Sequence, residues 1–500
     1  MYMYICYHTC ILYRQIKKNL MEMEEKIGMN KTNLPLIIIY FLVLSIGQTS
    51  LSVGYSKNIK NVDWENPLPR FSQMDVNLHD LVELIGEGQL ILFMPPQKIE
   101  LWTHGQIKSY DNARLACAMT VVDLPEETVR LRFSAIAKTL AAFPQYKEVQ
   151  NVAMRDNHVM VKYIEEFDLG AFPLKSAYYW QYTAEDNGDV SALLHKGDVD
   201  ASALRFEFLP ISNKKTLLVL THWHDMASAS FFYRLFLKAN PETKMTSIPV
   251  ATSMMIQQCK ETFLEDSGIK RQERHTYGSK MDIPLYSIRS DLKQTLYKIA
   301  QIGTPILLHP KKDYAYNGGK LPLQFATCVQ TYPVPISLIK PHIWDVKTMP
   351  EYFPQFDHVS EAPLPEGKKI QIQMKYGVGF ISLKLNFTFD YLIYNNNVSH
   401  FQNPNGDILI LGAEEIVEVS TPSNKPATIQ VYTVGSLIGK NAPWLIRYLE
   451  KSLPEADLMR NVAMALVRVE QQLPWMIDKL GHSCNDKKYI DNQSSLPLLR

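Results

Sequence analysis

The chain has 500 residues, of which 46% are hydrophobic and 21% charged, and its formal net charge is +1. At roughly 100 to 200 residues per domain, this length predicts between two and four globular domains. With a net charge so close to zero, the chain lacks the strong positive charge that binding to a phosphate backbone favours. We therefore expect no nucleic-acid partner.

One apolar segment near the N-terminus carries a targeting signal. Residues 34–46 read LPLIIIYFLVLSI, follow Lys31 and precede the small and polar residues 48–52. The apolar run is short for a membrane span, which needs about 20 residues, and it is typical of a secretory signal peptide. We therefore predict an N-terminal extension, 1–56, with a signal peptide or membrane anchor, and an exported protein that is periplasmic or membrane-anchored.

The cysteines do not form a disulfide framework. Two of the six precede the apolar segment, and the other four contain no Cys-x-x-Cys pair: Cys117, Cys259, Cys328 and Cys484. Because Cys117 and Cys328 stand in apolar runs, we expect free thiols that behave as small buried hydrophobic groups.

An internal repeat defines the domain organisation. A Phe-Pro-Gln-aromatic motif occurs twice, 210 residues apart, and a proline stands 18 residues before each copy, at Pro125 and Pro335. Self-similarity of this kind predicts two copies of one domain, which we place at 67–266 and 284–480 with a linker at 267–283 and a polar tail at 481–500. The motif residues are Phe143, Pro144, Gln145 and Tyr146, and Phe353, Pro354, Gln355 and Phe356.

Both copies predict the same order of elements. A short amphipathic helix (78–85; 292–302) precedes an apolar strand, a second strand (115–122; 323–332) and a helix opened by proline. Five or six strands with turn residues between them follow, which indicates an antiparallel meander. Each copy ends on a long helix, at about 243–264 and 455–479. The expected meander strands are 149–154, 159–167, 177–183, 190–195, 204–209 and 216–224 in copy one, and 370–376, 381–392, 398–402, 408–419 and 428–434 in copy two.

A strand, a helix pair, a long meander and a closing helix, in this order, resemble the START-like (SRPBCC) superfamily, in its polyketide-cyclase and coenzyme Q-binding branch. The Phe-Pro-Gln motifs with their upstream prolines carry the resemblance, which covers about 110–265 and 323–480. It implies an α+β fold of two tandem helix-grip domains, each a curved antiparallel sheet around its C-terminal helix. The preceding segments, 67–109 and 284–322, lie outside the resemblance although they too are duplicated.

Such a fold implies an apolar ligand. Space between a curved sheet and a helix is usually apolar with few polar anchors, and a lipid, isoprenoid, quinone or aromatic molecule would fill it. Residues expected to line a cavity, or alternatively to fill a plain core, are Tyr178, Trp180, Met254, Met255, Phe380, Phe387, Phe389 and Trp444.

Catalytic and metal motifs are scarce. His222, His224 and Asp225 suggest a metal site, because the two imidazoles share one strand face, but copy two has Tyr432, Val434 and Gly435 there by simple offset, and a solvated strand end is the alternative. We predict no metal and no cofactor. The carboxylate pairs 165–166 and 414–415 are expected to place one member on each face of a strand, which leaves acid–base catalysis as a secondary hypothesis.

Three functions remain open from the sequence. The first is non-enzymatic binding or transport of a hydrophobic ligand, and it agrees with the scarcity of catalytic groups. The second is an aromatase/cyclase-like enzyme, and the third is a structural or partner-binding tandem module with filled cores. A hydrophobic small molecule or lipid is the expected partner. A membrane surface near Lys311 and Lys312 competes with a solvated turn there.

Overall fold

The structure is a computed structural model. It describes residues 62–155, 157–168, 173–229, 241–268, 292–316, 319–378, 381–395, 397–403, 406–421, 424–443, 446–447 and 456–483. The apolar segment 34–46 and almost all of the linker lie outside these ranges, so their predictions stay untested.

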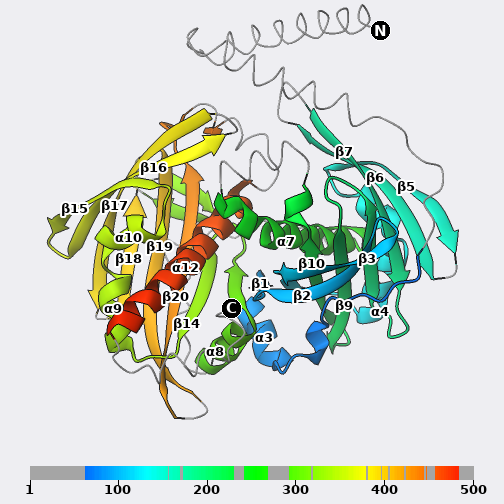
Figure 1. The fold of residues 1–500 in the computed structure, drawn as a ribbon, viewed down its shortest axis with the longest axis horizontal. Helices are drawn as coiled ribbons and strands as arrows, with labels where there is room; N and C mark the ends of the chain where they lie inside the picture. The colour runs from blue at the N-terminus through cyan, green and yellow to red at the C-terminus, as the bar shows by residue number, and fades with distance from the viewer. Residues whose placement is uncertain are drawn as a thin grey trace, which may run out of the picture.

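One continuous antiparallel sheet runs through both copies (Figure 1). Its sixteen strands lie in the order β15-β16-β17-β18-β19-β20-β14-β11-β1-β4-β10-β9-β8-β7-β6-β5. The copies meet where β1 (Gln89–Phe93) pairs with β11 (Thr304–Leu308), and the register is symmetric about Ile91 and Ile306. A pseudo-two-fold axis therefore relates the two halves.

Copy one contains an eight-stranded half of the sheet. Helix α3 (Leu78–Ile85) precedes β1, and a hairpin separates β1 from β4. The remaining elements are β2 (Gln97–Thr103), β3 (Gln106–Ala113), β4 (Ala116–Val122), α4 (Glu126–Ser134), α5 (Ile136–Ala141), β5 (Tyr146–Arg155), β6 (His158–Asp168), β7 (Pro173–Ala184), β8 (Val190–Lys196), β9 (Ser202–Ser212), β10 (Lys215–His224) and α7 (Pro241–Asp266), with short 3-10 turns η2 (Phe71–Gln73) and η3 (Met226–Ser228).

Copy two repeats this order. Helix α8 (Lys293–Ile302) corresponds to α3, and α12 (Ala456–Ser483) corresponds to α7. Between them lie β11, β12 (Lys312–Tyr316), β13 (Gly319–Leu323), β14 (Ala326–Tyr332), α9 (Ile336–Ile343), η4 (Val346–Thr348), α10 (Met349–Tyr352), β15 (Phe356–Leu364), β16 (Gly367–Val378), β17 (Ile381–Asn395), β18 (Val398–Asn403), β19 (Ile408–Ser420) and β20 (Pro426–Ile438).

Most predicted elements are confirmed, and the structure corrects several details. The expected strand 323–332 is two strands, because β13 ends at Leu323 and β14 begins at Ala326. The first meander strand of copy two, β15, was missed, and α12 extends to Ser483 into the expected tail. Lys311 forms an ion pair with Asp457 and Lys312 begins β12, so the solvated turn expected there is instead a paired residue and a strand.

Local sequence explains where the early helices begin and end. Asn77 caps α3 by accepting the backbone N–H of His79, and Gly86 ends it with φ of 51°, a conformation that glycine adopts without steric cost. Pro125 precedes α4, and Glu126 and Glu127 stand in its first turn, where negative charge suits the helix dipole.

The long helices share one face of the sheet, here called the inner face. On β1 this face carries Gln89, whose amide oxygen accepts a hydrogen bond from Ser253 of α7 at 2.7 Å. On β11 it carries Thr304, which donates to Glu470 of α12 at 2.5 Å. Both helices therefore lie on the same side of the joined sheet (Figure 1).

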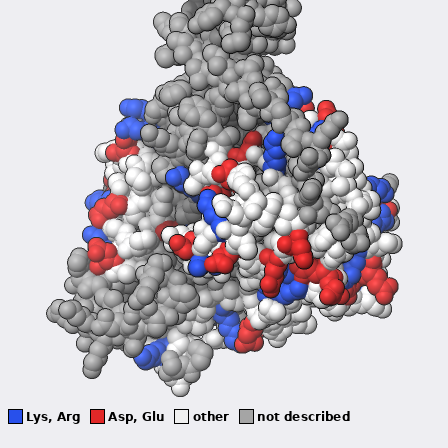
Figure 2. Space-filling view, turned by 45° about the vertical axis from the view of Figure 1, so that its right-hand side comes forward, with Lys and Arg blue, Asp and Glu red and all other residues white. Residues whose placement is uncertain are grey.

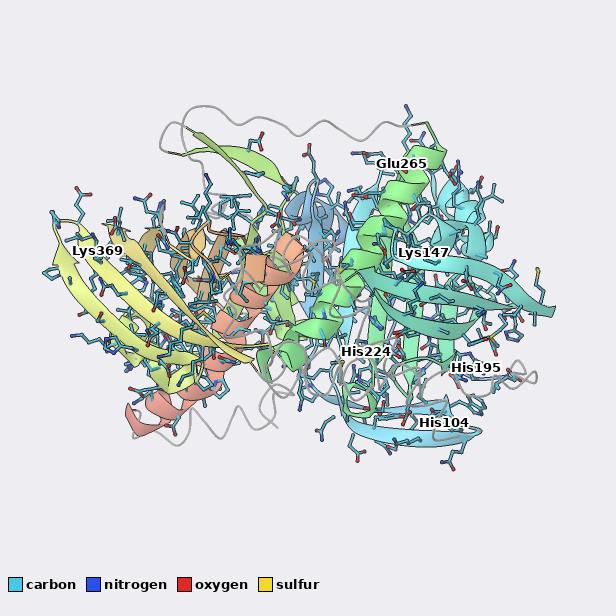
Figure 3. The ribbon with its side chains drawn as sticks, turned by 90° about the horizontal axis from the view of Figure 1, so that it is seen from above. His104, Lys147, His195, His224, Glu265 and Lys369 are labelled. Atoms are coloured by element: carbon cyan, nitrogen blue, oxygen red, sulfur yellow. The ribbon has the colours of Figure 1, made fainter. Side chains whose placement is uncertain are left out.

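The opposite, outer face of copy one is also covered. The hairpin β2–β3 lies against it, with the ring of Tyr110 4.7 Å from that of Trp223. Figure 3, viewed from above, shows this hairpin, which carries His104, away from α7, which carries Glu265. Because both faces are covered, every residue of β4 is buried, and the strand is a continuous apolar run rather than an alternating one.

Residues 62–77 complete this cover through charged groups. Glu207 accepts the backbone N–H of Phe71 at 2.6 Å and of Ser72 at 3.0 Å. Nearby, Arg205 donates to Glu185 at 2.8 Å, and Arg70 pairs with the same carboxylate. Buried charges need such partners, so this network fixes the segment on the sheet.

The surface carries charges of both signs. Lys and Arg are interspersed with Asp and Glu over the face shown in Figure 2. Among the described residues no helix is both long and apolar enough to cross a lipid bilayer.

Glycines allow the two copies to approach closely. A Cβ on Gly88 would stand 2.0 Å from the carbonyl oxygen of Leu308, and one on Gly303 2.8 Å from that of Phe93. Next to this contact, Arg114 forms a bidentate pair with Glu470 of the other copy, at 2.9 and 3.1 Å. The junction therefore combines strand pairing with a charged bridge.

We predict that Gly88→Ala weakens this junction. The added methyl group meets backbone that must move, so we expect the free energy of unfolding to fall by roughly 2 kcal/mol, measured by urea denaturation. Gly105→Ala is the control, because no atom lies within 4 Å of its added Cβ and only its φ of 86° opposes the change. A Gly88→Ala protein no less stable than the control would contradict the close contact.

Candidate ligand site on the inner face of copy one

Strand registers give a residue-by-residue correspondence between the copies. The path starts at Ile91 in copy one and at Ile306 in copy two, and moves from each residue to its register partner on the next strand of the sheet. By this path Phe206 corresponds to Glu414, and Trp180 corresponds to Phe389. The same path ends with Tyr146 opposite Glu165 in copy one and Phe356 opposite Met374 in copy two. The predicted alignment of Tyr146 with Phe356 is thus confirmed by the register.

The registers also correct one part of the sequence alignment. His222 lies opposite Ala116, and Val434 lies opposite Ala326. His222 therefore corresponds to Val434, and His224 to Ser436, rather than to Tyr432 and Val434. The register path shows that the offset has grown from 210 to 212 residues at this point of the chain.

Aromatic rings cover the inner face of copy one. The rings of Tyr146 and Tyr163 stack at 4.2 Å, and those of Tyr163 and Tyr178 stack at 5.4 Å. Phe143 of the repeat motif lies 5.4 Å from Tyr146. Because β5, β6 and β7 are neighbours, alternate residues on them form one continuous aromatic surface.

Trp180 leaves a polar group unpaired on this surface. Its side chain is 5% exposed, and its indole Nε1–H has no hydrogen-bond partner among the described residues. A buried donor without a partner costs about 1 to 3 kcal/mol, so such groups call for an explanation. The corresponding residue of copy two is Phe389, which has no donor to satisfy.

Two carboxyl groups stand at the end of the aromatic surface. Glu165 projects from the inner face of β6, and Asp198 follows β8. The Tyr178 hydroxyl lies close enough to both carboxyl groups to lower the pKa of each, and Ser176 donates a hydrogen bond to Asp198. Within the described part of the chain, no ion pair joins either carboxylate to a basic side chain.

The environment favours the protonated form of these acids. Burial, with a smaller contribution from the nearby Asp198, raises the pKa of Glu165 to about 7 although the Tyr178 hydroxyl opposes the shift. Burial also raises the pKa of Asp198. A carboxyl group with a pKa near neutrality can give or take a proton. The adjacent Glu166 faces the other way and pairs with Lys175 at 3.1 Å, which confirms the expectation of one member on each face.

Copy two has a different inner face. Arg468 of α12 is buried and donates to Glu414 at 3.2 Å and to the hydroxyl of Tyr352 at 2.8 Å. Glu414 also accepts hydrogen bonds from Gln430 at 2.5 Å and Tyr391 at 3.3 Å. This network connects α12 to the sheet, and the guanidinium of Arg468 is the counter-ion of the Glu414 carboxylate.

The inner-face carboxylates stand at different positions in the two copies. Phe206 stands in copy one where copy two has Glu414, and Met374 stands in copy two where copy one has Glu165. No sequence signal pointed to Arg468, because its partner is 54 residues away. Alternation along β6 and β19 was the only signal, and it placed one carboxylate of each pair inward.

The predicted cavity residues separate into three groups. Trp180, Phe387 and Phe389 are buried, whereas Tyr178, Met254 and Met255 are partly exposed and pack against the core. Phe380 and Trp444 lie outside the described residues. In the repeat motifs, Phe143, Gln145, Tyr146 and Phe353 are buried, Gln355 and Phe356 are partly exposed, and Pro144 and Pro354 are exposed.

The histidines near the end of β10 form a buried chain rather than a solvated strand end. His222 lies 3.1 Å from the Thr252 hydroxyl, and His224 lies 3.2 Å from His222. Burial lowers the pKa of His222 well below its usual value and that of His224 to about 4. Asp225 instead caps η3, and within the described ranges no three His, Cys, Asp or Glu side chains form a group suited to a metal.

We predict that the ion pair of copy two is strongly coupled. Arg468→Met leaves Glu414 buried without its counter-ion, so we expect a loss of about 3 to 5 kcal/mol in the free energy of unfolding. The double variant Arg468→Met/Glu414→Gln is expected to lose less than the sum of its two single changes. Lys375→Met, which removes the exposed partner of Asp357, serves as control and should cost under about 1 kcal/mol. Additive effects in the cycle would contradict the network.

The raised pKa of Glu165 predicts a pH-dependent stability. Between about pH 4.5 and 7 the unfolded chain loses this proton while the folded chain keeps it, so stability falls as pH rises through this window. Glu165→Gln removes this contribution and should be more stable than the natural chain at pH 8 by roughly 2 kcal/mol, but not at about pH 4. Urea unfolding at both pH values measures the difference. Glu166→Gln should show no such gain, and equal behaviour of the two variants would contradict the assignment.

Comparison with known proteins finds similarity in structure only. No family model matches the chain, and no curated protein does either. Among solved structures, TTHA0849 from Thermus thermophilus is 19% identical, with 31% of this chain and 99% of that one covered and a TM-score of 0.26. The di-domain aromatase/cyclase StfQ of the steffimycin biosynthetic pathway is 8% identical, with 72% and 99% covered and a TM-score of 0.23. The human StarD13 lipid transfer and protein localization domain is 12% identical, with 34% and 89% covered and a TM-score of 0.23.

The order of elements is independent of these scores. In each copy one strand, a helix pair, six antiparallel strands and a long helix follow one another, and the first of these strands pairs with the last strand of the meander. This is the order that the resemblance implied, and both copies have it. The chain therefore has a START-like fold in two tandem domains.

Proposed function

We propose that copy one, 67–266, binds a hydrophobic small molecule between the inner face of its sheet and α7, as a helix-grip domain, and that copy two, 284–480, is its scaffold. The unpaired indole N–H of Trp180 carries this proposal. A ligand with a hydrogen-bond acceptor would satisfy this donor, and no described protein group does.

Partly exposed side chains of copy one suit an apolar ligand. Tyr178 on β7, with Met254 and Met255 on α7, keep part of their surface accessible although they pack against the core. Methionine side chains adapt to varied ligand shapes, and aromatic rings provide flat apolar area. A mainly apolar lining with a few fixed polar groups is typical of small-molecule sites.

Copy two has less need of a ligand. Its inner face contains the Arg468–Glu414 network where copy one has Phe206 on the sheet. The buried charges of this network are paired within the protein, so we assign to copy two the role of holding copy one through the β1–β11 junction. A chain with one binding copy should take up one ligand.

We predict one ligand per chain and a dependence on Trp180. Native mass spectrometry with lipid extraction, on protein purified from the envelope of the expressing host, should find about one bound molecule. Trp180→Phe gives copy one the residue that copy two has at Phe389, so the fold should tolerate it, while ligand occupancy falls at least about 5-fold as one buried hydrogen bond is lost. Phe389→Trp in copy two is the matched control and should not change occupancy.

Two results would contradict this assignment. Two molecules per chain would show that copy two also binds, and an unliganded mass that persists after incubation with lipid and quinone mixtures would favour the structural module with filled cores.

An enzyme with acid–base chemistry is the second candidate, and the pKa of Glu165, raised to about 7, favours it. In that case Glu165 would exchange a proton with the bound molecule, and Tyr178 would hold the carboxyl group in place. Recovery of an altered molecule after incubation, lost in Glu165→Gln, would support the enzyme, whereas recovery of the molecule unchanged supports the carrier.

We also propose that the protein acts outside the cytoplasm, on the basis of the apolar segment 34–46 and its flanking residues. The intact mass of the protein from the envelope tests this, because a signal peptide is removed and an anchor is retained. A full-length protein recovered from the cytosol would exclude export.

A further inference from the structure

We infer that the ligand of copy one carries a positive charge, as an ammonium group on a hydrophobic body. This inference rests on the proposed function and adds the charge of the ligand. It starts from Glu165 and Asp198, two carboxyl groups that Ser176 brings together: Ser176 lies opposite Glu165 on the neighbouring strand and donates a hydrogen bond to Asp198.

The first step concerns hydrogen atoms. A phenol has one O–H, so Tyr178 can donate to only one of the two carboxyl groups at a time. Ser176 supplies a second donor to Asp198. When both acids are ionised, several carboxylate lone pairs on this partly enclosed surface therefore have no donor among the described residues.

The second step concerns charge. Glu165 and Asp198 repel each other, and neither forms an ion pair with a described basic side chain. Lys175, the nearest lysine along β7, pairs with Glu166 on the other face at 3.1 Å. Like charges in a site of reduced solvation are stabilised by a cation placed between them.

Copy two shows how this fold neutralises an inner-face carboxylate. There Glu414 receives the guanidinium of Arg468 from α12, at 3.2 Å. Asp407, which follows β18 as Asp198 follows β8, accepts the backbone N–H of Asn386 at 2.8 Å. Glu414 thus has an internal counter-ion, whereas neither Glu165 nor Asp198 pairs with a described basic side chain.

The third step concerns the rings. The stacked tyrosines 146, 163 and 178 present electron-rich faces beside the carboxyl groups. Aromatic faces attract organic cations, most strongly where water is excluded. Burial raises the pKa of all three hydroxyl groups well above the usual value, so the rings stay neutral and do not add further charge.

Taken together, the carboxyl pair supplies charge, the tyrosines supply ring faces, and Trp180 and α7 supply apolar area. An ammonium ion with an alkyl or aromatic body matches all three. A fatty acid or an acidic lipid head would meet two carboxylates without a described counter-ion and would be repelled.

The test compares matched probes on the purified full-length chain. Decyltrimethylammonium, decanol and decanoate have the same chain length and differ in charge, and isothermal titration calorimetry at about pH 8 measures each below its micelle concentration. We expect the cation to bind at least about 10-fold more tightly than decanol, and decanoate to bind more weakly than both. Phenyltrimethylammonium is a fourth probe. Binding of either cation supports the proposal, and the cation with the higher affinity shows whether the site prefers a compact aromatic amine or a lipid-like one.

Variants separate this inference from the proposed function. Glu165→Gln/Asp198→Asn should lose at least about 10-fold in affinity for the cation and keep its affinity for decanol, whereas Glu166→Gln, altered on the other face of the same strand, should bind both as before. The inference that the ligand is positively charged is overturned if decanol binds as tightly as the cation, or if the double variant keeps its affinity for the cation. Neither result contradicts the proposed function. If the natural chain binds none of the probes, and Trp180→Phe does not change the ligand occupancy measured by mass spectrometry, both this inference and the proposed function are overturned.

Discussion

The pairing of β1 with β11 is the interaction on which the rest of the structure depends. It joins two eight-stranded halves through a symmetric antiparallel register, with the geometry of an isologous contact inside one chain. Without this pairing, β1 and β11 would be edge strands with unpaired backbone groups. The segments that precede the START-like order in each copy provide the joining strands, which explains why they are duplicated with the domains.

This junction also sets the arrangement of the helices. Because the sheet is continuous, the face that carries Gln89 continues into the face that carries Thr304, and α7 and α12 pack side by side on it. Arg114 and Glu470 then connect the residues just before β4 in one copy with the closing helix of the other. A change in one copy can thus reach the other through a short path of packed groups.

Much of this fold could be predicted from the sequence, because its signals are local. The Phe-Pro-Gln motifs, the proline-opened helices and the closing helices were found by repetition and periodicity, and α3 begins and ends as predicted. The sequence did not indicate the hairpins β2–β3 and β12–β13; in β3 most residues are exposed, so the strand lacks the alternation that would predict it. The junction itself depends on two strands far apart in the chain, β1 and β11, and no local pattern indicates which edges meet.

The long-range partners of the site residues also could not be predicted from local sequence patterns. Alternation predicted that one member of the pair Glu165 and Glu166 faces inward, yet the partners of an inward carboxylate come from other strands and from the closing helix. A drift of two residues in the repeat was enough to align His222 with Tyr432, whose counterpart in the structure is Leu220. Pairing registers resolve such drift because every strand fixes its neighbour, whereas a sequence offset accumulates each small insertion.

The contrast between the copies is the strongest argument about function. Both copies place a carboxylate on the inner face, which is costly unless it is paired. In copy two Arg468 provides the counter-ion of Glu414, so this inner-face charge is paired within the protein. In copy one Glu165, Asp198 and the indole of Trp180 remain without a full set of partners among the described residues. A fold that gives the inner-face carboxylate a counter-ion in one copy, and leaves the inner-face carboxylates of the other copy without a described one, has its stability lowered at that place. An external molecule bound there would restore the missing interactions.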